Sequence, residues 1–312
     1  MKHIRPTYCE QFYCTGESCP APCPAPLDMT WTRAVGEFCE TGLSLACPKA
    51  ATLILQHAEK TTFHQEHDTL PPDKLSETEQ EYLARILDAR KTMDLLLQDR
   101  DMGYRPSIVL ALTYGAEFDP LITAKNRYAY EELDWGFTEQ PNRQFQAVVQ
   151  LTGSWEHKRT DMCSILSEFQ QLCIGDTILD NHLSETLKLF QTISGEEYRI
   201  MRDQFDRYME QKPHLFENLL LYYVHRYFLS DTNLQTVEPG VKLMAVSAAL
   251  LRALAARIWK ETGNLTEDTF TVLCWHYSRC TEENQKVYQT ICGRFCQSPL
   301  YSWERLQRLL WR

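Results

Sequence analysis

Clustered cysteines are the first feature of this sequence whose residue type and spacing suggest chemistry. Half of the 12 cysteines lie before residue 48, and four of them fall in the stretch YCEQFYCTGESCPAPC. Thiolates on a loop rich in proline and glycine suit a [4Fe–4S] cluster or a tetrahedral zinc ion. The spacing contains neither the C-x2-C knuckle of a zinc ribbon nor the C-x3-C-x2-C motif of radical enzymes. It therefore leaves an iron–sulfur cluster, zinc and non-ligand thiols as alternatives for these positions: Cys9, Cys14, Cys19, Cys23, Cys39 and Cys47.

The cellular compartment determines whether these cysteines are expected to form disulfides. The first residues, MKHIRPTYCEQF, lack the apolar stretch of about 7–15 residues that a signal peptide needs. The apolar run LLLYYV is too short to cross a bilayer. We therefore expect a cytoplasmic protein with no membrane partner. Thiols stay reduced there, so metal or redox chemistry is favoured over structural disulfides.

Charge and glycine content exclude two further classes. The formal net charge is −10, and nucleic-acid binding requires a concentrated basic face, so we expect no nucleic-acid partner. The 12 glycines form neither G-x-G-x-x-G nor G-x-x-x-x-G-K-[ST]. A nucleotide held by a glycine-rich turn between a strand and a helix is therefore not supported.

The rest of the chain predicts an all-α protein. Residues 1–48 read as an irregular cysteine-rich module, because prolines at alternate positions from Pro20 to Pro26 prevent regular structure. Residues 49–312 read as one multi-helix domain. A capping box at Ser76–Glu79 and Pro106 each mark a helix start. One short strand is expected at 145–153, and the other expected helices span 183–193, 196–210, 214–229, 241–260 and 267–279.

Five segments in chain order resemble one known family. They are Y-x3-F-x-C-x-G-x2-C-x3-C at 8–23, LSLACPKAA at 43–51, the helix at 104–118, FENL with the following YY at 216–223, and YSR with its later glutamate at 277–283. In this order they resemble the flagellin lysine-N-methylases, and the resemblance covers most of the chain.

The resemblance implies an activity, cofactors and a partner. Members transfer methyl groups from S-adenosylmethionine to lysines of flagellin and carry an iron–sulfur cluster on N-terminal cysteines. It implies Cys14, Cys19 and Cys23 as ligands, with Cys39 or Cys47 as a further thiolate. Zinc is the alternative metal.

The sequence also departs from the family pattern. Pro24 stands where the family has the second cysteine of a Cys-Cys pair, Asn284 stands in place of a histidine, and the connection at 24–42 is short. These departures motivate an alternative from another class, a non-catalytic helical member that binds a metal or a partner.

Methylation needs a neutral amine, whereas lysine has an ordinary pKa of about 10.4. An apolar pocket with a carboxylate or tyrosinate acceptor provides one. Within the FENL segment, Glu217, Tyr222 and Tyr223 are the candidates, with Asn218 orienting substrate or cofactor. The competing interpretation is that the apolar and aromatic residues are core, and that Glu217 and Asn218 lie on the helix surface.

Overall fold

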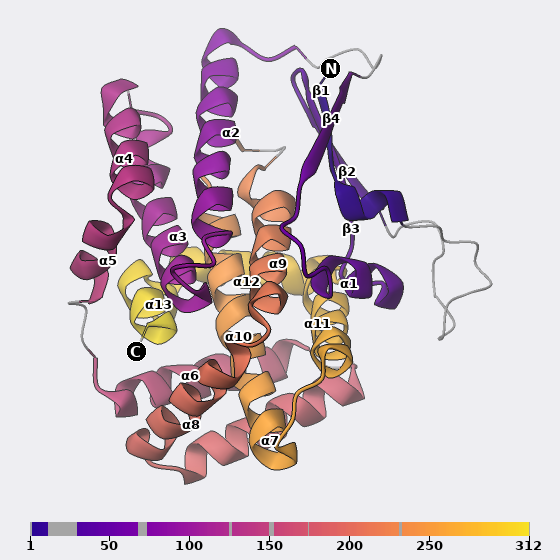
Figure 1. Cartoon of the computed structure of the whole chain (residues 1–312), viewed down its shortest axis with the longest axis vertical. Coiled ribbons are helices and arrows are strands. Elements are labelled where there is room, and N and C mark those ends of the chain that lie inside the picture. The colour runs from indigo at the N-terminus through magenta and orange to yellow at the C-terminus, as the bar shows by residue number, and fades with distance from the viewer. Residues whose placement is uncertain are drawn as a thin grey trace.

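The computed structural model describes most of the chain. The described ranges are 2–11, 30–67, 74–124, 127–149, 153–173, 175–230 and 233–311. Within them the protein is mostly helical, with 13 α-helices and one small sheet (Figure 1). The all-α prediction is therefore confirmed for the body of the molecule.

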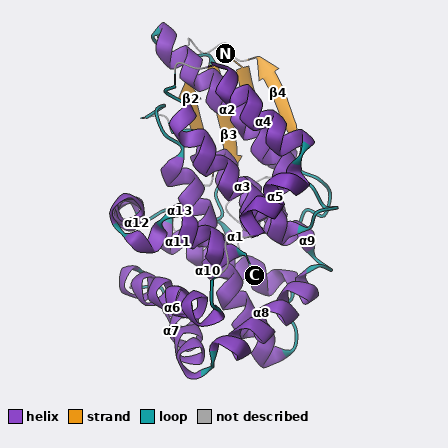
Figure 2. Cartoon of the chain, turned by 90° about the vertical axis from the view of Figure 1, so that its left-hand side faces the viewer, coloured by secondary structure: helices purple, strands orange, loops and turns teal. Residues whose placement is uncertain are grey.

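The sheet contains four short strands and sits at one end of the molecule (Figure 2). Its strands are β1 (Lys2–Pro6), β2 (Thr30–Val35), β3 (Phe38–Leu43) and β4 (Phe63–His67), in the order β2-β3-β1-β4. Gly36 takes a φ of 58° in the turn that joins β2 to β3, a conformation that favours glycine. β1 pairs in parallel with β3 and antiparallel with β4.

The prediction of irregular structure over 1–48 is wrong for β1, β2 and β3. β2 carries Thr, Trp and Val, residues that fit a pleated strand, and β3 is buried along most of its length. β4 extends the sheet beyond residue 48. A short 3-10 helix, Thr7–Gln11, follows β1.

The helices follow the sheet in chain order. Their bounds are α1 (Pro48–Leu55), α2 (Glu77–Leu97), α3 (Tyr104–Phe118), α4 (Arg127–Glu139), α5 (Pro141–Val149), α6 (Trp155–Leu172), α7 (Thr177–Thr192), α8 (Gly195–Met209), α9 (Pro213–Tyr223), α10 (Glu238–Thr262), α11 (Glu267–Thr281), α12 (Gln285–Gln297) and α13 (Trp303–Leu310). A π-helix, Val224–Phe228, continues α9.

Local signals explain where several helices begin. Ser76 and Glu79 form the expected capping box at the start of α2. Helices overlap all five ranges expected between residues 183 and 279. The expected strand at 145–153 is wrong, because α5 covers its first part. Pro141 lies in the first turn of α5, and the Phe145 ring packs edge-on against Trp311 at 4.6 Å.

α10 forms the centre of the molecule. It is buried along most of its 25 residues, and it packs against α3, α8, α9 and α13. In both ribbon views the sheet lies at one end and helices α6, α7 and α8 lie at the other (Figures 1 and 2). α9 and its π-helix connect these parts, because they contact α10, α1 and α2.

Candidate functional site

Three distant parts of the chain meet beside the π-helix. They are the loop between β3 and α1, the end of α9, and the turn between α11 and α12. Ser44 Oγ donates to Glu283 Oε1 at 2.7 Å, and the Trp275 indole donates to the Ala46 carbonyl at 2.8 Å. Three of the segments that carry the family resemblance, at 43–51, 216–223 and 277–283, therefore lie together in space.

The centre of this meeting point is the carboxylate of Glu282. The phenols of Tyr222 and Tyr227 both donate to Oε2, at 2.7 and 2.8 Å, and Tyr223 donates to Oε1 at 2.7 Å. Glu282 is only 8% exposed. A carboxylate has about four acceptor positions, so three phenols leave one for a further donor.

The three phenols are hydrogen-bond donors at neutral pH. Burial raises the pKa of Tyr222, Tyr223 and Tyr227 well above the ordinary value, and the negative charge of Glu282 raises it further. The Arg226 guanidinium opposes this effect at Tyr222 and Tyr227. Of the two acceptors that the sequence suggested, a carboxylate or a tyrosinate, the geometry therefore favours the carboxylate.

The π-helix accounts for the convergence of two of these tyrosines. Tyr222 lies in the last turn of α9 and Tyr227, five residues later, lies in the π-helix, whose wider turn with i→i+5 hydrogen bonds brings such positions closer to one face. An α-helix would separate these positions by more than a quarter of a turn. Single-turn π segments occur frequently at functional sites, and this one lines a pocket.

The pocket has a volume of about 280 Å³ and opens to solvent. Tyr227 stacks on Tyr288 at 5.5 Å between ring centroids, and on Tyr223 at 5.9 Å. Aromatic faces beside a carboxylate favour a cation. The lining residues come from β2, the π-helix region, the α11–α12 turn and α12: Trp31, Thr32, Arg33, Arg226, Tyr227, Leu229, Ser230, Glu282 and Tyr288.

Arg226 lies at the wall of this pocket with two of its nitrogens engaged. Nε donates to the Tyr227 hydroxyl at 2.9 Å, and Nη2 donates to Glu283 Oε1 at 3.2 Å. Nη1 is buried, and none of the residues that the structure describes accepts a hydrogen bond from it.

A comparison with protein families identifies the helical body. The family model for the FliB lysine N-methylase C-terminal domain matches residues 90–309. The chain belongs to the FliB lysine N-methylase family. No curated protein matches the chain, and no solved structure matches it either.

The FliB match contains most of the candidate site. It begins within α2 and ends within α13, so it includes the three tyrosines, Arg226 and Glu282. The sheet lies outside the match, and with it Trp31 and Arg33.

Within the described ranges, none of the helices is long and apolar enough to cross a lipid bilayer.

The four predicted catalytic residues divide into two pairs. Tyr222 and Tyr223 lie at Glu282, as described above. Glu217 instead accepts two hydrogen bonds from Arg100, at 2.6 and 3.0 Å. Asn218 donates to the carbonyls of Leu55 and His57, at 3.3 and 2.7 Å, and so holds the segment that follows α1.

The competing interpretation of this helix is right in one respect and wrong in another. Phe216, Leu219, Tyr222 and Tyr223 are all buried in the core, as it expects. Glu217 and Asn218 are each only 2% exposed, so neither lies on the helix surface. Sequence reasoning missed Glu282, although it named the adjacent Glu283.

The predicted metal ligands fall mostly outside the described residues. Cys14, Cys19 and Cys23 lie in the range 12–29, which the structure does not describe. Cys39 is buried on β3, and Cys47 is buried at the N-cap of α1. No group of three or more His, Cys, Asp or Glu residues in the described ranges is arranged to hold a metal ion. The metal site therefore stays a prediction from the sequence.

A buried histidine anchors the π-helix on its other side. His225 Nδ1 lies 3.0 Å from Glu40 Oε1, and His225 Nε2 lies 3.0 Å from Asp94 Oδ1. Arg90 pairs with Glu40 at 2.7 Å, and the Phe63 ring stacks on His225 at 4.0 Å. These contacts fasten the π-helix to β3, β4 and α2.

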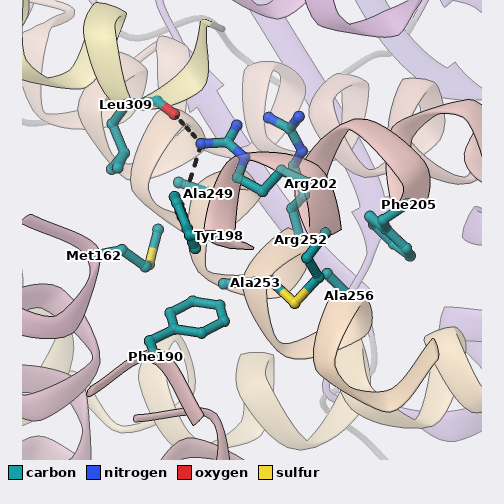
Figure 3. A pocket seen from close by; sticks show the side chains of 11 residues that line it. Met162, Phe190, Tyr198, Arg202, Phe205, Ala249, Arg252, Ala253, Ala256 and Leu309 are labelled. Carbon is teal, nitrogen blue, oxygen red and sulfur yellow. Dashed lines mark hydrogen bonds between the residues drawn. The ribbon is translucent and has the colours of Figure 1, made fainter. Parts of the chain in front are cut away.

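A second buried carboxylate, Asp206 on α8, forms a closed cluster. Arg252 makes a bidentate pair with it, Arg105 Nη1 lies 3.0 Å from Oδ2, and the Tyr104 hydroxyl donates to Oδ1 at 2.5 Å. Arg202 lies next to this cluster and donates to the Leu309 carbonyl at 2.8 Å (Figure 3). The cavity next to the cluster, lined in part by Arg202 and Arg252, measures only about 10 Å³, which is too small for a ligand.

Proposed function

We propose that this chain is a protein lysine N-methyltransferase that methylates lysine side chains of flagellin, with S-adenosylmethionine as methyl donor. One observation carries the proposal: Glu282, Tyr227 and Tyr288 line an aromatic pocket within the region that matches the FliB lysine N-methylases, and three phenols orient the Glu282 carboxylate. Flagellin as the partner follows from the family, and the proposal places the reaction in the cytoplasm.

The pocket suits a lysine side chain. The side chains of Trp31 and Tyr288, which line the pocket, would pack against the methylene groups, and cation–π attraction to an ammonium is worth about 0.5–2 kcal/mol. The free acceptor position of Glu282 would bind the amine nitrogen. Tyr222, Tyr223 and Tyr227 fix the orientation of that carboxylate.

Methyl transfer requires the lysine ammonium to lose a proton before its nitrogen can form a bond to the methyl carbon. The ammonium loses one proton to Glu282, and the nitrogen lone pair then forms a bond to the methyl carbon. When bound, S-adenosylmethionine would supply that methyl group from its sulfonium, and a neutral thioether would be the leaving group. A general base of this kind contributes about 10²–10⁴-fold to rate.

Glu217 and Asn218 act as positioning residues in this proposal. The Arg100–Glu217 pair and the contacts of Asn218 hold α9 against the segments before and after it. They therefore help to hold α9 in place without contacting Glu282 through any of these bonds.

We further propose a [4Fe–4S] cluster on Cys14, Cys19 and Cys23, with Cys39 or Cys47 as the fourth thiolate and zinc as the alternative metal. The four-cysteine spacing and the family support this proposal. Protein purified without oxygen would contain iron and acid-labile sulfide, and Cys19→Ser would lose both, because thiolate ligation couples to folding. Unchanged metal content in Cys19→Ser would contradict the ligand assignment.

Mass spectrometry tests the activity directly. Purified protein, S-adenosylmethionine and unmodified flagellin are incubated without oxygen, and the mass of each lysine-containing peptide is measured. We expect added masses of methyl groups on lysine, and none when S-adenosylmethionine is omitted. Unmethylated flagellin despite a complete metal content would contradict the proposal and favour a non-catalytic binding protein.

A further inference from the structure

Arg226 leaves one charged donor group unused in the candidate site. Its Nε and Nη2 donate to Tyr227 and Glu283, whereas Nη1 is buried and finds no acceptor among the described residues. A buried polar group without a partner is destabilising by about 1–3 kcal/mol, and more when it is charged. Native proteins therefore keep few such groups, and each requires an explanation such as a ligand.

The guanidinium is held in place before any ligand arrives. Its central carbon lies 5.5 to 6.0 Å from the ring centroids of Tyr227, Tyr222 and Trp31. Stacking on several rings restricts the rotation of a long side chain, so less entropy is lost when a ligand binds. The group is thus preorganised at the wall of the pocket.

A second arginine strengthens the positive charge at this wall. Arg33 on β2 lines the same pocket and donates to the backbone carbonyls of Arg226 and Leu229. Its guanidinium also lies 5.4 Å from the Trp31 ring centroid. Two arginines therefore face a pocket whose lining includes a single carboxylate, that of Glu282, and three phenols already donate to it.

The wall of the pocket at Arg226 and Arg33 favours an anionic group, whereas the Glu282 carboxylate favours a cation. The unused Nη1 group of Arg226 carries N–H donors and shares the positive charge, so a carboxylate matches it better than a carbonyl or a hydroxyl does. At about 280 Å³ the pocket lies at the small end of the range for ligand sites. It accommodates a short carboxylate-bearing segment, while the remainder of the ligand extends through the open side.

We infer that Arg226 binds the carboxylate of the amino-acid end of the methyl donor, with Arg33 reinforcing the positive charge. This inference rests on the proposed function, because it assigns one end of S-adenosylmethionine to the pocket that contains Glu282. The assignment brings donor and lysine into one pocket, as direct transfer of a methyl group requires.

Binding measurements with two unreactive probes test this inference without catalysis. One probe is S-adenosylhomocysteine, and the other is its analogue without the carboxyl group. Isothermal titration calorimetry compares the full-length protein, purified without oxygen, with Arg226→Gln. Arg143→Gln is the matched control, because Arg143 is exposed on α5 and also loses one charge. Circular dichroism verifies that each variant is folded.

The expected pattern depends on the probe. Wild type and Arg143→Gln bind S-adenosylhomocysteine at least about tenfold more tightly than the decarboxylated analogue, as one charge-assisted hydrogen bond provides. Arg226→Gln loses this preference and binds both probes with similar affinity. The wild-type preference alone is informative if the variant does not fold, because equal affinities for the two probes would overturn the inference.

Other outcomes separate this inference from the proposed function. An equal loss of affinity for both probes in Arg226→Gln would show that the arginine only shapes the pocket. That result would overturn the inference. If the binding of an acidic flagellin peptide depended on Arg226, and the binding of S-adenosylhomocysteine did not, Arg226 would bind a carboxylate of the protein substrate. That result would overturn the inference. Carboxylate-dependent binding to a protein that leaves flagellin unmethylated would support this inference while contradicting the proposed function.

Discussion

Two buried carboxylates, Asp206 and Glu282, have contrasting surroundings. Asp206 is paired with the guanidinium groups of Arg252 and Arg105 in a closed part of the helical body. Glu282 accepts hydrogen bonds from three neutral phenols, and the nearest guanidinium, that of Arg226, lies 3.9 Å away. Only Glu282 borders an open pocket.

The difference shows which surroundings leave a buried carboxylate available to bind a cation from outside the protein. Burial acts to raise the pKa of Asp206, but the arginines outweigh it and lower that pKa. Its charge is thus fully used within the fold. The phenols of the other cluster orient Glu282 without neutralising it, so its charge remains available to a cation from outside. The first cluster is structural, and the second is suited to chemistry.

Asp206→Asn has the largest expected effect on stability. The substitution leaves Arg252 without its counter-charge in a buried place and removes the nearer carboxylate of Arg105, which we expect to lower the free energy of unfolding by about 3–5 kcal/mol. Urea denaturation followed by circular dichroism measures it. Asp203→Asn, one turn earlier on α8 and more exposed, is the control, with an expected change below about 1 kcal/mol. A similar small change for Asp206→Asn would mean that this cluster is not structural.

Glu282→Gln is expected to affect stability less. Glutamine keeps one acceptor oxygen for the phenols, and no closely paired cation is left without a partner, so we expect a loss of about 1–2 kcal/mol. The same urea denaturation measures it. A loss as large as that of Asp206→Asn would contradict the distinction between the two regions.

A rise in pH above about 6.5 should weaken the stabilisation from the His225 contacts that anchor the π-helix and leave that from the Asp206 cluster unchanged. Burial acts to lower the pKa of His225, but the charge of Asp94 and hydrogen bonds to Asp94 and Glu40 outweigh it and raise the pKa. Arg90 opposes this rise. Burial acts to raise the pKa of Glu40, but Arg90 and His225 outweigh it and lower that pKa to about 2. The stabilisation from charged His225 is thus fully present below its unfolded pKa of about 6.5. It is lost as pH rises through the raised pKa of the folded state.

His225→Gln provides the comparison for this pH dependence. The free energy of unfolding of the wild type should fall relative to that of the variant as pH increases above about 6.5. Urea denaturation at a series of pH values measures both. A constant difference between the two proteins across this range would contradict a charged His225.

The sequence predicted the local features well and the long-range ones poorly. The capping box at Ser76 and the Ala/Leu-rich stretch that became α10 are local, so pattern alone located those helices. β1 pairs with β3, which lies more than thirty residues later in the chain, and no local sequence pattern predicts such pairing. At 145–153 the apolar run suggested a strand, but Pro141 and packing against α3 favour a helix.

The same division applies to the candidate site. Tyr222 and Tyr223 were found because they follow a recognisable motif. Glu282 was missed because its phenol partners lie about 60 residues earlier in the chain, and only folding brings them together. Glu217 belongs to the motif, yet its carboxylate is held by Arg100. Position within a motif therefore did not reveal which carboxylate faces the pocket.

Methylation rates of two glutamate variants test the central claim most directly. Glu282→Gln and Glu217→Gln are compared with wild type at saturating S-adenosylmethionine, with flagellin methylation followed by mass spectrometry and each rate normalised to folded protein. The account predicts a loss of at least about 100-fold for Glu282→Gln and less than about threefold for Glu217→Gln. A large loss for Glu217→Gln with near-normal activity for Glu282→Gln would contradict it.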